Sequence, residues 1–235
     1  MPIFAFLSVW AVLSIPAHAI DHDRARGFKR QQQEAPPENW SRVLFHHKPL
    51  LILAVTVAIF HFANASMLPL IGQKLALAHP GFETALVSAC ILVAQLVTIP
   101  VAMVVGIRAD VWGRKPMLIA ACFALVLRAT IFALFDSVPI LVAAQVLDGI
   151  SAGILDILIP LVLADLVGST GRYSMSRGFV GTVQGVGGSL SNVAAGTMVN
   201  LAGYSAAFVG LATVAAIACC VVYFAMPETG KNTQP

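Results

Sequence analysis

Charged residues are scarce in this sequence. Only 11% of its 235 residues are Asp, Glu, Lys or Arg, whereas soluble domains carry about 25%. Apolar and aromatic residues make up 58%, the mean hydropathy is +0.86, and the apolar residues form blocks of about 20 or more, the length of a transmembrane helix. A water-soluble domain, a disordered chain and a disulfide-stapled secreted module are therefore excluded. We predict an integral membrane protein whose first partner is the lipid bilayer.

The sequence also lacks the features of metal, nucleic-acid and nucleotide sites. Its cysteines lie inside apolar blocks, without a CxxC or metal-ligand spacing. The net charge is only +3, and no basic run is interleaved with aromatics. No Walker-type phosphate loop occurs. We therefore expect no metal, no cofactor and no nucleic-acid partner. The cysteines, interpreted as small core residues, are Cys90, Cys122, Cys219 and Cys220.

No segment alternates between apolar and polar residues, so a transmembrane β-barrel is excluded. A bilayer core of about 30 Å needs about 20 apolar residues in a helix, and six such stretches follow a polar region. The sequence thus predicts an all-α, polytopic membrane helix bundle with six spans in residues 49–226. The predicted spans are Leu50 to Leu77, Thr84 to Val105, Pro116 to Phe135, Pro139 to Val167, Phe179 to Leu201 and Tyr204 to Ala225.

Residues 1–19 form a further apolar stretch that ends in Ala17-His18-Ala19. This end resembles a secretory cleavage site, but no positive charge precedes it. Residues 20–48 are polar and are interpreted as a flexible linker. A cytoplasmic linker places nearly all cations inside, as the positive-inside rule requires. We therefore predict that residues 1–19 are a span, with a signal peptide as the alternative. The tail, residues 227–235, is then cytoplasmic, and the membrane is the plasma or inner membrane. The cations placed inside are Arg24, Arg26, Lys29, Arg30, Arg42, Lys48, Arg108, Arg114, Lys115, Arg172, Arg177 and Lys231.

A charged turn separates the second and third predicted spans. It reads Gly106-Ile107-Arg108-Ala109-Asp110-Val111-Trp112-Gly113-Arg114-Lys115. This turn resembles the G-x-x-x-D-R-x-G-R-R loop of the major facilitator superfamily, with Val111 in place of the usual first arginine. Two other segments resemble the same family: the glycine-rich start of the fourth span, Gln145 to Gly153, and a terminal Pro227-Glu228-Thr229-Gly230. The positions that fit the loop are Gly106, Asp110, Gly113, Arg114 and Lys115.

The resemblance implies a fold and an activity. Members have twelve spans in two six-helix halves, each with a three-plus-three inverted repeat. They move small solutes by alternating access, driven by a solute or proton gradient rather than ATP, and are not enzymes. This chain then corresponds to the last span of an amino-terminal half, the central linker and a whole carboxy-terminal half. We expect a fragment, a truncated relative, or a half that needs a separate amino-terminal half or a second copy. Drug or metabolite efflux is the expected type.

The charged turn is the predicted gate. Its glycines permit a tight reversal of the chain, and Arg114 and Lys115 suit anionic lipid headgroups. Asp110 can pair with a helix end or a basic residue in one conformation and release it in another, which would bias a two-state motion. A solvated loop that only obeys the topology rule is the alternative.

Ionisable groups inside spans are expensive and are functional candidates. Arg128 and Asp148 lie at similar predicted depths of about 10 and 13 Å in adjacent spans. They can therefore form a buried ion pair that locks two helices or, through Asp148, contacts substrate. Asp156 has no evident cation at its depth. An unpaired carboxylate there has a raised proton affinity, as proton coupling requires; a carboxylate facing an aqueous vestibule is the alternative.

His61 and Asn64 share a face of the first span near its middle. Pro69 and Gly72 follow, so we expect a kink or unwinding where a substrate can meet backbone groups. With Asp148 and Asp156, these two residues are the candidate substrate or proton contacts; interhelical hydrogen bonding is the alternative role for both.

Small residues recur every four positions along the fifth predicted span, a pattern that permits close approach of helix backbones. We expect this stripe to pack against a neighbouring helix. Its members are Gly181, Gly185 and Ser189, with Gly188, Asn192 and Gly196.

Three classes of function remain: a secondary transporter, a seven-helix receptor or photoreceptor, and a non-transporting membrane scaffold. The last span has no lysine to carry retinal, and a receptor does not require the charged turn. Gly149 to Gly153 fits the G-x-S-x-G motif of hydrolases, but it lies in an apolar helix and no histidine follows His79. We predict a proton-coupled transporter of a small solute, with the scaffold and the receptor-like protein as alternatives.

Overall fold

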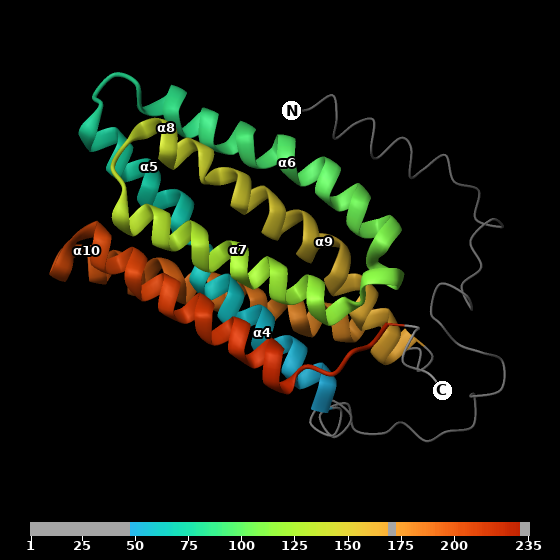
Figure 1. Cartoon of the computed structure of the whole chain (residues 1–235). Helices are drawn as coiled ribbons and strands as arrows, with labels where there is room; N and C mark the ends of the chain where they lie inside the picture. Colours follow the sequence, from blue (N-terminus) through green and yellow to red (C-terminus); the bar gives the residue numbers. More distant parts are fainter. Residues whose placement is uncertain (1–47, 169–172, 231–235) are drawn as a thin grey trace, which may run out of the picture.

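The computed structural model describes residues 48–168 and 173–230, and every regular element in these ranges is a helix. The all-α prediction is confirmed for them, whereas the predicted span at residues 1–19, nearly all of the linker and the end of the tail lie outside the described residues. The helices, shown in Figure 1, are α4 (Lys48–Asn64), α5 (Met67–Ala78), α6 (Glu83–Trp112), α7 (Arg114–Leu134), α8 (Val138–Ala143), α9 (Gln145–Val167) and α10 (Tyr173–Ala225).

Five described stretches are long and apolar enough to cross a membrane. The longest, α10, has 53 residues and would measure about 80 Å as one straight helix, far more than a bilayer core of about 30 Å. It is interrupted at Gly203, whose φ of 83° and ψ of 173° are not helical, and Figure 1 shows the chain doubling back there. The two arms of α10 correspond to the last two predicted spans, so the described residues supply all six predicted crossings.

Two of the crossings are built from two consecutive helices. α4 ends at Asn64 and α5 begins at Met67, so the first crossing is interrupted just before Pro69, as expected. Pro69 lies in the first turn of α5, where a missing N–H is tolerated. The fourth crossing is interrupted at Ala144, between α8 and α9. No glycine or proline marks that second interruption, and the sequence did not predict it.

The turn between the second and third crossings is shorter than predicted. α6 continues through Gly106 and Asp110 to Trp112, about two turns past the predicted end at Val105. The reversal is made by Gly113 alone, whose φ of 86° favours glycine. The prediction that Gly106 shapes the turn was therefore wrong. A single glycine costs a helix only about 1 kcal/mol relative to alanine, so it does not by itself end the helix.

Glycines set the closest helix contacts. A Cβ at Gly149 on α9 would collide with the carbonyl oxygen of Ala94 on α6, and one at Gly187 on α10 would collide with that of Ala58 on α4. Gly153, four residues after Gly149, faces α6 in the same way. α9 therefore packs on α6, and α10 on α4, backbone against backbone. The apparent hydrolase motif is a helix-packing motif.

Of the small-residue stripe predicted for the fifth span, Gly188 faces the first crossing, with an added Cβ 3.4 Å from Cβ of Ala65, but other members do not pack in this way. An added Cβ at Gly185 or Gly196 would meet no described atom within 4 Å, and Ser189 is exposed. For these three residues the prediction chose the wrong face, because two stripes on this helix share a spacing of four and only tertiary contacts distinguish them. The buried stripe consists of Gly187, Ser191 and Ala195.

Replacing Gly149 by Ala should destabilise the bundle by about 1–3 kcal/mol, because the added methyl forces α9 away from α6. Gly185→Ala adds the same methyl to open space and should change stability by no more than about 0.5 kcal/mol. Thermal unfolding in detergent, followed by the reactivity of the buried thiols of Cys90 and Cys122, measures both variants. Equal stability of the two would contradict the backbone contact.

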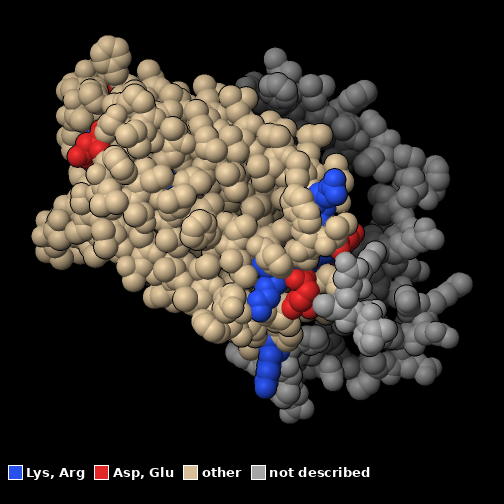
Figure 2. Space-filling view, viewed as in Figure 1, with Lys and Arg blue, Asp and Glu red and all other residues tan. Residues whose placement is uncertain are grey.

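Charged side chains gather at the ends of the molecule. Figure 2 shows most of the visible Lys, Arg, Asp and Glu residues at the end of the molecule that carries the α6–α7 turn. A small acidic group lies at the opposite end, and the surface between the two ends is tan. An apolar belt with charged ends is the surface expected of a protein that crosses a bilayer several times. The chain is a multi-pass membrane protein.

Candidate functional site

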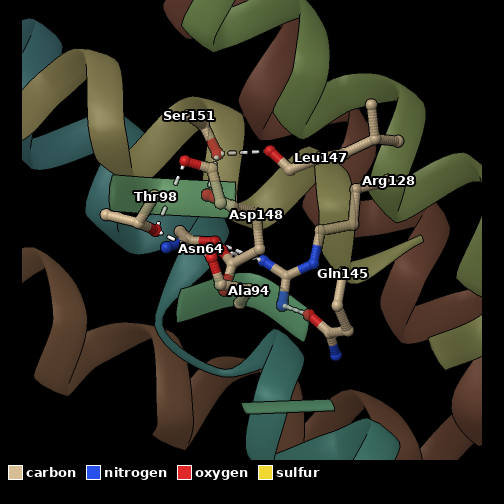
Figure 3. Close-up of polar contacts among 9 residues, drawn as sticks. Asn64, Ala94, Thr98, Arg128, Gln145, Leu147, Asp148 and Ser151 are labelled. Atoms are coloured by element: carbon tan, nitrogen blue, oxygen red, sulfur yellow. Dashed lines mark hydrogen bonds and ion pairs between the residues drawn. The ribbon is translucent and has the colours of Figure 1, made fainter. Parts of the chain in front are cut away.

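Arg128 is the centre of a polar cluster inside the bundle (Figure 3). It projects from α7, and its side chain is 1% exposed. Nη1 donates to Asp148 Oδ1 at 2.6 Å and to Asn64 Oδ1 at 2.8 Å, while Nη2 donates to Gln145 Oε1 at 2.9 Å. The centroid of the Phe132 ring lies 5.2 Å from Cζ. The ion pair that matching depths suggested is therefore present, with two amides as further acceptors.

This cluster joins the two interrupted crossings. Asn64 is the last residue of α4 and Gln145 is the first residue of α9. The Arg128 guanidinium therefore donates hydrogen bonds to a residue beside each of the two interruptions. A buried charge needs such partners, since removing it from water costs several kcal/mol. Nε of Arg128 and Nε2 of Gln145 have no hydrogen-bond partner among the described residues. The geometry fits the locking role for the pair, with some hydrogen-bonding capacity unused in this conformation.

A small polar cavity lies next to the cluster. Its volume is about 110 Å³, and α4, α9 and α10 all contribute to its walls. His61, Asn64 and Asp156 line it, so three of the four candidate contacts converge on one space. The fourth candidate, Asp148, is absent from the lining and belongs to the Arg128 cluster. The other polar lining residues are Arg177 and Gln184.

Asp156 has a cation in its own cavity, contrary to the prediction. Arg177 was placed in the cytoplasm before the fifth span, but it is the fifth residue of α10 and lines the cavity. No described basic group lies within 4 Å of the Asp156 carboxylate, and its side chain is exposed. A carboxylate and a guanidinium therefore line one cavity without forming an ion pair with each other.

Arg114 organises the charged end of the bundle. Its Nη2 lies 2.7 Å from Asp110 Oδ1, and its Nε lies 3.2 Å from Asp165 Oδ2. The Arg114 side chain is only 3% exposed. Asp110 thus pairs with a basic residue, one of the two partners expected for it. Lys115 Nζ lies 5.9 Å from the centroid of the Tyr223 ring. Asp165, on α9, belongs to no motif, and the sequence analysis missed it.

Glu228, in the terminal P-E-T segment, caps the first turn of α7. Its carboxylate accepts the backbone N–H of Arg114 at 2.8 Å and that of Lys115 at 3.1 Å. The N–H groups of Thr229 and Gly230 donate to it at 3.0 Å. Partial burial acts to raise the pKa of Glu228, but these four donors outweigh it and hold the pKa below its ordinary value. The carboxylate therefore ties the end of α10 to the start of α7.

Gly113 provides the space for this carboxylate. A Cβ at Gly113 would lie 2.7 Å from Oε2 of Glu228, and the positive φ of the residue already disfavours a side chain. The charged turn and the terminal P-E-T segment, which the sequence presents as separate motifs, therefore form one structure. Only the three-dimensional contact reveals that connection.

Glu228→Ala should lower the stability at neutral pH by about 1–2 kcal/mol, the usual value of a helix cap. Because the folded pKa of Glu228 is lowered, its contribution is present above its ordinary value of 4.5 and is lost as the pH falls through the folded pKa. The difference between wild type and variant should therefore vanish in acid, as pH-dependent thermal unfolding can measure. Glu228→Gln, which keeps an acceptor without charge, should show a smaller loss. A difference in stability between wild type and Glu228→Ala that stays the same at acid pH would contradict this contact.

Comparison with known proteins assigns the family. A model of the Major Facilitator Superfamily matches residues 50–235. The chain belongs to the major facilitator superfamily (MFS). Two curated relatives, both named uncharacterized MFS-type transporters, come from Mycobacterium tuberculosis strains CDC 1551 / Oshkosh and H37Rv, and each is 46% identical over 226 residues. The match covers 96% of this chain but 54% of each relative, so the chain spans about half their length.

A solved MFS structure has the same fold. The proton:xylose symporter XylE, bound to 6-bromo-6-deoxy-D-glucose, matches with a TM-score of 0.64 at 17% identity. The match covers 80% of this chain and 46% of that protein. The MFS resemblance read from the charged turn is therefore confirmed, and the coverage supports the interpretation of the chain as one half. MFS membership points to a transporter rather than an enzyme.

Proposed function

We propose that this chain forms one half of the pathway of a secondary transporter, which moves a small polar solute across the plasma or inner membrane by alternating access coupled to protons. The observation that carries the proposal is the convergence of polar side chains from α4, α9 and α10 on one cavity. In MFS proteins the substrate site lies at the interface of the halves. A separate amino-terminal half, or a second copy of this chain, would complete the cavity. The converging residues are His61, Asn64, Asp156, Arg177 and Gln184.

The lining favours a polar metabolite over a lipophilic drug among the expected efflux substrates. A carboxylate and a guanidinium can each hold an opposite charge or a hydroxyl group, and two amides offer both donors and acceptors. Such groups discriminate strongly against solutes that leave them unpaired. A solute with several hydroxyl groups, or with one cation and one anion, therefore suits the cavity.

Asp156 is the proposed proton site. When it is deprotonated, its charge attracts Arg177 across the cavity; when it is protonated, that attraction disappears and Arg177 is free to hold a solute. The proton and the solute then act on the same charge pair, which couples their movements. Asp148 is unsuited to this role, because its carboxylate contacts the buried Arg128 and does not line the cavity.

The Arg114 cluster is the proposed gate. Arg114 links α6 to α9 through Asp110 and Asp165, and Glu228 links the end of α10 to α7. These contacts hold one end of the bundle closed, and a two-state motion requires that some of them break. Nη1 of Arg114 has no hydrogen-bond partner among the described residues, so it can donate to a further acceptor in another state. A solvated loop would not bury this side chain.

The positive-inside rule supports the proposed orientation. The α6–α7 turn and the carboxy terminus are then cytoplasmic, residues 20–48 form a cytoplasmic linker, and residues 1–19 cross the membrane from outside.

Reconstitution tests the proposed function. The full chain, alone and co-expressed with the amino-terminal half of a Mycobacterium tuberculosis relative, is placed in vesicles that contain a pH-sensitive dye. Sugars, amino acids and organic acids are then added outside one at a time. We expect at least one polar solute to move protons in the co-expressed sample and none in vesicles without protein. A scaffold would leave the internal pH unchanged for every solute, and that result would refute proton-coupled transport.

A further inference from the structure

A larger apolar groove lies away from the solute cavity and shares no lining residue with it. α6 and α7 are joined at Gly113, and Figure 1 shows α9 running between them. The groove has a volume of about 590 Å³, within the range of about 300–1,000 Å³ usual for ligand sites. Its lining includes Pro100, Val101, Val104, Trp112, Met117 and Ile154.

The basic residue Arg108 lies on the same face of α6 as two residues that line this groove. Arg108 lies four residues after Val104 and four before Trp112 on α6, and side chains four apart share one face of a helix. Arg108 is exposed and has no ion-pair partner among the described residues. The neighbouring Asp110 is paired with Arg114 and does not neutralise it.

We propose that the groove binds an anionic phospholipid, with one acyl chain between α6 and α7 and the phosphate at Arg108. The apolar walls match a hydrocarbon chain, and the cation lies at the charged end of the bundle, where headgroups begin. Basic pockets between membrane helices on the cytoplasmic side are known to hold anionic headgroups. Trp112 lies one helical turn nearer the charged end than Arg108, and aromatic residues are enriched at membrane interfaces.

The groove lies where a bound lipid can stabilise the conformation of the protein. Its walls are the two helices joined by the α6–α7 turn, and its floor is α9, which carries Asp165. A lipid chain in the groove packs against α6 and α7 next to the end where Arg114 binds Asp110 and Asp165. The occupied groove therefore stabilises the conformation described here.

Fluorescence quenching of Trp112 tests the site without reference to transport. Trp10→Phe and Trp40→Phe leave Trp112 as the sole tryptophan of the full chain, which is reconstituted in vesicles with increasing fractions of brominated phosphatidylglycerol or brominated phosphatidylcholine. We expect half-maximal quenching at an about fivefold lower fraction of phosphatidylglycerol, the effect of one cation worth about 1 kcal/mol. Equal quenching by the two lipids would overturn the proposal.

Three variants localise the effect. Arg108→Gln should bring the fivefold preference to about one, whereas Lys115→Gln, at the same end of the bundle, should leave it in place. Equal losses from both would show a general surface attraction and refute the site. Ala120→Phe, which fills the groove, should also abolish the preference while Arg108 is retained; a preference that survives would place the lipid outside the groove. Thiol-monitored unfolding checks that Ala120→Phe is folded, and Val104→Phe is the substitute if it is not.

Discussion

Asp148→Leu should destabilise the bundle by about 3 kcal/mol. The change leaves the Arg128 guanidinium, 1% exposed, without its only ionised partner among the described residues. Breaking a buried ion pair on one side costs about 3–5 kcal/mol. The lower end of that range applies here because Asn64 and Gln145 still accept hydrogen bonds from Arg128. Thermal unfolding in detergent, followed through the buried thiols, measures the loss.

A double variant shows whether the instability of Asp148→Leu comes from the lost ion pair itself or from the buried Arg128 charge that is left without a partner. Arg128→Met with Asp148→Leu removes both charges and leaves apolar side chains of similar size. Replacing a buried pair in this way is often neutral or stabilising, but Asn64 Oδ1 and Gln145 Oε1 lose their donor. The double variant should therefore be destabilised by about 1–2 kcal/mol, less than the single variant. A double variant as unstable as the single one would show that the charge of Arg128 is not the cause.

Asp156→Asn should reduce proton-driven transport at least tenfold, to the level of vesicles without the protein. Asparagine keeps the size of the side chain but does not ionise, so the proposed proton site is removed. Exchange of solute between equal concentrations, which needs no net proton movement, should persist. Dye-reported proton flux and radiolabelled solute exchange in the co-expressed sample measure the two activities separately.

Two carboxylates provide the controls for Asp156. Asp136→Asn removes an exposed carboxylate that pairs with Lys74 at the opposite end of the bundle, and proton-driven transport should be unchanged. Asp156→Glu keeps an ionisable group in the cavity and should restore coupling in part. If Asp156→Asn left proton-driven transport intact, His61 would be the next group to test and the proposed role of Asp156 would be refuted.

The sequence predicts the membrane crossings well because the signal is a length of apolar residues, which needs no tertiary information. It also predicts the interruption before Pro69, where a backbone donor is missing. It does not predict the interruption at Ala144, because the residues around it are ordinary helix formers. Nor does it tell which of two small-residue stripes on α10 is buried, since both have the same spacing.

Some residues of the candidate site could be predicted from the sequence, and others could not. Asp148 and Arg128 are predictable as partners because depth along two adjacent spans can be counted from the sequence. The place of Arg177 in the cavity was missed because a cation near the start of a helix looks like a topology signal. Asp165 and Glu228 gain their roles only from distant contacts with Arg114, which no local pattern encodes.

The aqueous access of the cavity is the most direct test of the proposed pathway. Gln184→Cys is introduced into a chain whose own cysteines are replaced by Ala, and Phe123→Cys, at an exposed apolar position of α7, is the matched control. In the co-expressed, membrane-embedded protein, a charged impermeant thiol reagent should modify the cysteine at position 184 rapidly, and the transported solute should slow the reaction. The cysteine at position 123 should stay unmodified. If position 184 were as unreactive as position 123, the polar cavity would not open to water and the chain would not form a wall of a transport pathway.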